Sequence, residues 1–140
     1  GAACKLNTNN ARKRQADAMQ GPAINEYGTG WVAVNGEKFS ASMVISAAGP
    51  RFAWNCAHFE ELQASHFELL AEMDAELIIF GSGDRIRFPQ PQWLQSLYAR
   101  RIGLETMDTQ AACRTYNFLA AEGRKVVAAL LLEPGKTLGT

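Results

Sequence analysis

Residues 76–117 read ELIIFGSGDRIRFPQPQWLQSLYARRIGLETMDTQAACRTYN, and this stretch decides the fold class of the chain. It opens with the apolar run Leu77–Phe80, which predicts a buried strand, and then enters the glycine-rich loop Gly81–Asp84. A helix follows the prolines, and a second short strand, Leu104–Met107, leads directly into another helix. This order of elements indicates two parallel strands of an α/β sheet.

A β-hairpin is predicted over residues 28–46. Asn35-Gly36 forms its turn, because a two-residue type I′ turn requires positive φ at both central positions. The return arm covers Lys38–Ile45, where apolar and polar residues alternate as in a strand with one buried face. Near the other end of the chain, Lys125–Leu132 is apolar on both faces, which predicts a central strand.

Two helices are expected before the last one. Ser65 and Glu68 have the spacing of a capping box, which predicts that a helix begins at Ser65. A second helix is predicted over residues 92–101, with Gly103 as the residue that ends it.

The last helix is predicted over residues 109–122. Asp108 or Thr109 caps its start, since either side chain can accept a hydrogen bond from a free backbone N–H of the first turn. Gly123 ends it, because glycine readily adopts the left-handed conformation that follows many helices.

The composition excludes several classes of function. Fourteen basic and 14 acidic residues give a formal net charge of zero, so we expect no nucleic-acid partner. The three cysteines form no Cys-x-x-Cys pair, and no further ligand type clusters near the two histidines, so we expect no disulfide framework and no metal site. No apolar run reaches the roughly 20 residues that span a bilayer, so no membrane insertion is expected. With no secretion signal, the expected location is the bacterial cytoplasm.

One domain is expected, over residues 21–133. Residues 1–20 are polar and without periodicity, which predicts a disordered arm whose first residues read as a cloning remnant. Its basic triplet, Arg12-Lys13-Arg14, is read as part of a solvated tail, the alternative being an anchor for nucleic acid or acidic lipid. Residues 134–140 are expected to form a flexible tail.

The predicted carboxyl ends of the strands are the place for a ligand site, because ligands of open α/β sheets bind at this edge. The candidate ligands for a small anion are Gly81, Ser82, Gly83, Arg85, Arg87 and Arg114. Glycines let N–H groups approach an anion, a helix N-terminus adds donors, and arginines pair with carboxylate or phosphate. The alternative is a tight turn whose arginines pair with local carboxylates, since no complete phosphate-binding motif is present.

Asp84, Asp108 and Cys113 are the candidate catalytic residues. The two carboxylates would form a general acid and base pair across the strand ends, although turn and capping roles explain both more simply. Cys113 lies about one turn into a helix beside Arg114, where its thiol pKa would be lowered. The alternative is an inert buried thiol, because no histidine is near it in the sequence.

Three aromatic residues offer a docking surface for a protein partner: Phe52, Trp54 and Trp93. Exposed aromatic side chains carry much of the binding energy of interfaces. The alternative is that they pack over the sheet as part of the core.

Five motifs together resemble the Mth-like domain family. They are LIIFGSG at 77–83, RFP at 87–89, IGLETMDT at 102–109, AACRTYN at 111–117 and A-x-EGR at 120–124. The resemblance runs over about residues 25–132. It implies a three-layer α/β fold with a mixed central sheet, flanking helices and an additional N-terminal β-hairpin layer. It implies no known reaction, no catalytic residue and no cofactor.

Two hypotheses of function follow. The first is a non-enzymatic protein-binding or assembly module, because the resemblance extends to proteins that assemble a mitochondrial respiratory complex. The second is an enzyme or small-anion-binding protein that uses the strand ends around residues 81–87 and 108–114. An edge strand of the hairpin would also permit a homo-oligomer, which the sequence leaves open.

Overall fold

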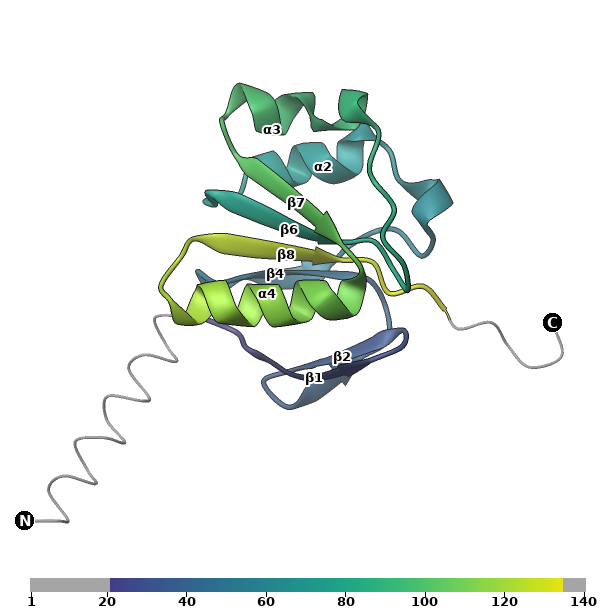
Figure 1. Cartoon of the computed structure of the whole chain (residues 1–140), viewed down its shortest axis with the longest axis vertical. Coiled ribbons are helices and arrows are strands. Elements are labelled where there is room, and N and C mark those ends of the chain that lie inside the picture. The colour runs from purple at the N-terminus through teal and green to yellow at the C-terminus, as the bar shows by residue number, and fades with distance from the viewer. Residues whose placement is uncertain (1–20, 135–140) are drawn as a thin grey trace, which may run out of the picture.

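The computed structural model describes residues 21–134. The arm predicted over residues 1–20, and all but the first residue of the tail predicted over residues 134–140, lie outside the described part. Figure 1 shows the arrangement of the elements. The strands are β1 Ile24–Gly28, β2 Trp31–Val34, β3 Glu37–Phe39, β4 Met43–Ser46, β5 Arg51–Ala53, β6 Leu77–Gly81, β7 Gly103–Met107 and β8 Val126–Leu130. The α-helices are α2 Ala64–Ala71, α3 Gln95–Ala99 and α4 Thr109–Ala121, and the 3-10 helices are η1 Phe59–Glu61 and η2 Pro91–Leu94.

The central sheet is mixed, with the strand order β5-β4-β8-β6-β7. β6 runs parallel to both of its neighbours, β7 and β8, whereas β4 is antiparallel to β8 and β5. Every residue of β8 is buried, which confirms the prediction of a central strand there. The parallel register places Gly81 opposite Met107 on one side and Leu130 on the other, so three carboxyl ends meet at one edge of the sheet.

Two hydrophobic cores lie on opposite faces of this sheet, and the alternation of β8 divides its side chains between them. Ala128 and Leu130 face the core that α4 shares with the three-stranded sheet β1-β2-β3. Val127 and Ala129 face the core formed with α2 and α3. In Figure 1, α4 lies in front of β8 and β4, while α2 and α3 lie together at the top, beyond β7. The predicted three-layer α/β arrangement with an additional β layer is confirmed.

The turn of the small sheet is the predicted one. Asn35 and Gly36 have φ values of 50° and 87°, as a type I′ turn between β2 and β3 requires. The other side of β2 pairs with β1, which the sequence did not predict because its residues, INEYG, show no apolar alternation.

The predicted return arm of the hairpin is wrong beyond Phe39. It was expected to continue to Ile45, but β4 belongs to the central sheet instead. Buried Ser42 anchors the chain there, because its Oγ accepts a hydrogen bond of 2.9 Å from the N–H of Leu132. A contact across 90 positions of sequence therefore divides one predicted strand between two sheets.

The predicted cap of α2 is also wrong. Gln63, and not Ser65, caps the helix, and the reciprocal partner is His66 rather than Glu68. The Nδ1 atom of His66 accepts a hydrogen bond of 3.0 Å from the N–H of Gln63. The other ring nitrogen lies 2.7 Å from the carbonyl oxygen of Asn55, a non-local contact that orients the ring toward the helix start.

The helix predicted over residues 92–101 is divided into η2 and α3. Arg101 takes the left-handed conformation at its end, with φ of 58°, and the N–H of Ile102 bonds to the carbonyl of Leu97 at 2.9 Å. Gly103, predicted as the terminating residue, instead begins β7, so the helix must end before it.

α4 follows its prediction closely. The carboxylate of Asp108 accepts a hydrogen bond of 2.9 Å from the N–H of Ala111, which is the expected N-cap contact. Gly123 has φ of 80°, and the next N–H, of Arg124, bonds back to the carbonyl of Leu119 at 3.0 Å. Both ends of this helix are therefore set by local sequence.

Candidate functional site

The two strand ends predicted to form a site do lie together. The N–H of Ser82 bonds to the carbonyl of Met107 at 2.9 Å, which joins the segment after β6 to the end of β7. One position later, Gly83 and Thr109 exchange two hydrogen bonds of 2.8 Å each. The glycine-rich loop is thus fastened directly to the first residue of α4.

Thr109 connects three elements through one buried hydroxyl. Its Oγ1 accepts the hydrogen bond from the N–H of Gly83 and donates another, of 2.9 Å, to the carbonyl of Leu131. The N–H of Leu131 in turn bonds to the carbonyl of Gly81 at 2.9 Å. The segments that follow β6 and β8 and the start of α4 therefore share a continuous set of hydrogen bonds.

Gly81 permits this close approach. A Cβ atom at this position would lie 2.9 Å from the Cα of Thr109 and 3.0 Å from the Cβ of Ala112. Those distances are shorter than carbon atoms tolerate, so a larger residue would push α4 away from the sheet.

Ser82 closes the turn that follows β6. Its fully buried hydroxyl donates to the carbonyl of Arg85 at 2.9 Å and accepts from the N–H of Arg87 at 2.8 Å. These two bonds hold the backbone on both sides of Ile86.

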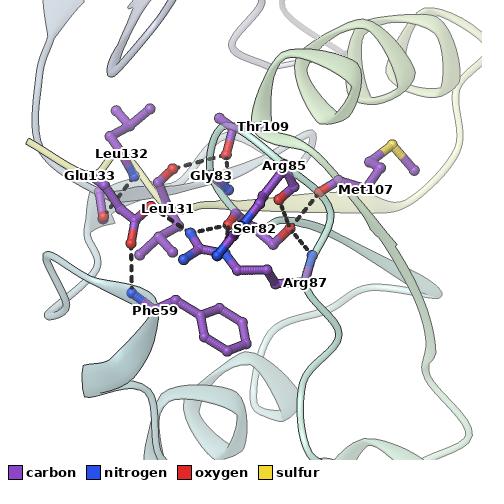
Figure 2. A network of polar contacts seen from close by, with 11 residues as sticks. Phe59, Ser82, Gly83, Arg85, Arg87, Met107, Thr109, Leu131, Leu132 and Glu133 are labelled. Atoms are coloured by element: carbon purple, nitrogen blue, oxygen red, sulfur yellow. Dashed lines mark hydrogen bonds and ion pairs between the residues drawn. The ribbon is translucent and has the colours of Figure 1, made fainter. Parts of the chain in front are cut away.

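Arg87 points inward and is held on several sides, as Figure 2 shows. Its Nε and Nη2 atoms donate to the carbonyl of Ser82 at 3.1 and 2.6 Å, and Nη2 also pairs with Glu133. The guanidinium lies 4.7 Å from the ring centroid of Phe59, whose N–H bonds to the other carboxylate oxygen of Glu133 at 2.9 Å. The side chains of the pair are only 18% and 23% exposed, so water screens this ion pair less than it does one on the open surface.

The other candidate arginines do not join Arg87. Arg114 lies on α4, where it stacks 5.9 Å from the Tyr27 ring and donates a 3.3 Å hydrogen bond to its hydroxyl, a contact that raises the pKa of Arg114. Tyr27 packs against the α4 core and Phe59 against the opposite one, so Arg114 and Arg87 are on different faces of the sheet. The side chain of Arg85 is exposed and contacts no polar group among residues 21–134.

Three of the N–H donors expected to bind an anion already have partners. The amides of Ser82, Gly83 and Thr109 all bond to acceptors within the protein, at 2.8 to 2.9 Å. An anion placed against these three groups would have to displace hydrogen bonds that hold the loop to the sheet.

The candidate catalytic residues are also separated or occupied. Burial raises the pKa of Cys113 to about 12, against the weaker opposing effect of Arg114, so the thiolate is scarcely present at neutral pH. Cys113 belongs to the α4 core, whereas His66 contacts Trp54 in the opposite one. Asp108 caps α4, and Asp84 is exposed on the loop. Within residues 21–134, no three His, Cys, Asp or Glu side chains gather closely enough to hold a metal ion.

The predicted aromatic anchors are mostly inside the protein. Trp54 is buried and donates a hydrogen bond of 3.2 Å to the carbonyl of His66. Trp93 is half-buried and stacks on Phe67 with the ring centroids 5.8 Å apart. Only Phe52, at 38% exposure, reaches the surface appreciably.

Sequence reasoning missed the residues that complete this region. Glu133 gave no signal as a partner of Arg87, because a single carboxylate after an apolar strand has no motif. Ile86 and Phe88 are more exposed than any of the predicted anchors, at 50% and 69%. The sequence signal for their exposure was the segment Arg-Ile-Arg-Phe, in which each apolar residue follows an arginine.

Within the described residues, no helix is both long enough and apolar enough to pass through a bilayer.

Comparison with known proteins agrees with the resemblance seen in the motifs. The sequence profile described as "Protein of unknown function (DUF498/DUF598)" matches residues 24–131. NADH dehydrogenase (ubiquinone) 1 alpha subcomplex assembly factor 3 from Homo sapiens is 34% identical over 125 residues, which are 88% of this chain and 67% of that protein.

Two solved structures are similar throughout the domain. A crystal structure of a protein from Bordetella parapertussis has a TM-score of 0.75 and 37% identity, covering 80% of this chain and 96% of that one. A solution NMR structure of a Mth938-like domain from Bordetella pertussis has a TM-score of 0.72 and 33% identity, covering 87% of this chain and 90% of that one.

Proposed function

This chain belongs to the DUF498/DUF598 family of proteins of unknown function, and from that premise we propose that it is a non-enzymatic module that binds other proteins during assembly of a multi-subunit complex. The human relative is by its name an assembly factor for NADH dehydrogenase. The corresponding role for this chain is to bind a subunit, or an assembly partner, of a respiratory NADH dehydrogenase.

One observation supports the proposal: apart from the exposed Asp84 and Arg85, the polar groups at the carboxyl edge of the sheet bind one another. Arg87 is paired with Glu133, Thr109 bridges Gly83 and Leu131, and Ser82 closes a turn. An enzyme requires a nucleophile or an acid and base pair that can reach a substrate. Here the same residue types stabilise a loop, which suits a surface built for binding.

The experiment is a comparison of cells of the source organism with and without this protein. We expect deletion to reduce assembled NADH dehydrogenase on a native gel, and expect its subunits or their assembly partners to co-purify with the tagged protein after chemical crosslinking. An unrelated tagged protein of similar size is the control. Unchanged assembly, together with no protein captured above the control, would contradict the proposal. A bound small molecule found by native mass spectrometry in place of a protein would favour the small-anion hypothesis.

A further inference from the structure

The most exposed large apolar residue of the described chain lies on the segment Asp84–Phe88, called here the 84–88 loop. Phe88 is 69% exposed and Ile86 is 50% exposed. Single exposed apolar residues are common on protein surfaces, so exposure alone does not identify a binding site. Two further properties of this loop do.

The first property is that the loop is held in one conformation. The Ser82 hydroxyl fixes the carbonyl of Arg85 and the N–H of Arg87, the residues on either side of Ile86. The side chain of Arg87 then ties the loop to Glu133. A surface that is rigid before binding loses less conformational entropy when a partner arrives, which favours affinity.

The second property is the pattern of charge. Asp84 and Arg85 are both exposed, and within residues 21–134 neither side chain has a hydrogen-bonding or ionic partner. Arg87 is neutralised by Glu133, so the loop presents one negative and one positive group beside two apolar side chains. A protein surface can match both signs, whereas an anionic membrane would attract Arg85 and repel Asp84.

We propose that the 84–88 loop is the docking surface for a partner protein, which receives Phe88 and Ile86 in an apolar pocket flanked by a carboxylate for Arg85 and a cation for Asp84. This inference rests on the proposed protein-binding function and specifies its surface. Ser82, Arg87 and Glu133 hold this loop in position through their hydrogen bonds and ion pair.

The experiment begins with a photo-crosslinking amino acid at position 88, in the otherwise complete protein and in its own cells. Phe118 on α4 is the matched control, because it is 63% exposed and lies on another element. We expect a protein crosslinked from position 88 and not from position 118, with the crosslink mapping to an apolar pocket of that protein.

The affinity of the crosslinked protein, once purified, is then measured for three variants. We expect Phe88→Ser to weaken binding at least about tenfold, as removal of a central aromatic anchor does, and Phe118→Ser to leave it unchanged. Arg85→Glu should weaken binding several-fold, with circular dichroism confirming that each variant is folded.

The outcomes separate this inference from the proposed function. A partner that binds Phe88→Ser as tightly as the unaltered protein would overturn the docking surface but leave the protein-binding function standing. No protein captured from either position, nor by the unaltered chain, would overturn both. Phe88-dependent binding to vesicles of phosphatidylcholine and phosphatidylglycerol, without a protein partner, would show a membrane-docking loop instead and overturn the inference.

Discussion

We expect Thr109→Val to lower the free energy of unfolding by about 3 kcal/mol, although valine has nearly the same shape as threonine. The substitution removes the hydroxyl that accepts from the N–H of Gly83 and donates to the carbonyl of Leu131. Both bonds are buried, with lengths of 2.8 and 2.9 Å, so water does not readily replace them.

The magnitude follows from the two groups left without partners. A buried N–H or carbonyl that loses its partner costs about 1–3 kcal/mol, and here there is one of each. The extra methyl group of valine offsets part of this, because it adds apolar surface to a buried position. Two such groups cost about 2–6 kcal/mol together, and an offset of about 1 kcal/mol from the methyl group brings the middle of that range to about 3 kcal/mol.

The assay is equilibrium unfolding in guanidinium chloride, followed by the fluorescence of the three tryptophans, of which Trp54 is buried in the folded protein. Thr115→Val is the control, since Thr115 is half-buried on the same helix. We expect a lower midpoint for Thr109→Val at an unchanged slope, because the surface exposed on unfolding stays the same. A loss below about 0.5 kcal/mol, similar to the control, would refute the reasoning, since the two groups would then have found other partners.

Three further predictions concern single residues. Cys113 should react slowly with iodoacetamide in the folded protein from about pH 7 to about pH 9, because its raised pKa of about 12 keeps the thiol protonated there. Rapid labelling of Cys113, detected by mass spectrometry, would instead show an accessible thiolate. Asp108→Ala should lower stability by about 1 kcal/mol, whereas Asp108→Asn should keep most of it, because asparagine still caps a helix; equal midpoints for the two variants would contradict the cap. Gly83→Ala should lower the stability of the fold by at least about 1 kcal/mol, because φ is 105° and the new methyl group meets the Arg87–Glu133 pair. Gly103→Ala is the control, since φ is not positive there, and it should cost less when both variants are measured by thermal unfolding.

The sequence was sufficient wherever the signal is local. The apolar runs 77–80 and 126–132 became β6 and the central strand β8, because a strand buried on both faces has no polar position. Asp108 and Gly123 marked the ends of α4 correctly, since both act on backbone groups within a few residues.

The errors occurred where a distant residue competes with a local pattern. The predicted return arm of the hairpin was too long. The hydrogen bond between Ser42 and Leu132 cannot be predicted from the sequence near either residue. The capping box of Ser65 and Glu68 fitted the local sequence, yet Gln63 is the N-cap residue of α2. Its reciprocal partner is His66, whose ring contacts a carbonyl of the preceding loop.

The candidate site shows most clearly what is set by local sequence and what is set by distant contacts. The sequence by itself determined that Gly81 to Arg87 and Asp108 to Arg114 follow the ends of neighbouring strands, because parallel strands point their carboxyl ends to one edge. Only the tertiary structure decided that Arg87 is bound by Glu133, 46 positions away, and that Arg114 lies on the other face of the sheet. The physical reason is that strand order and register bring together charges that are far apart in the sequence, and the pairing of those charges decides which side chains remain free to bind a partner.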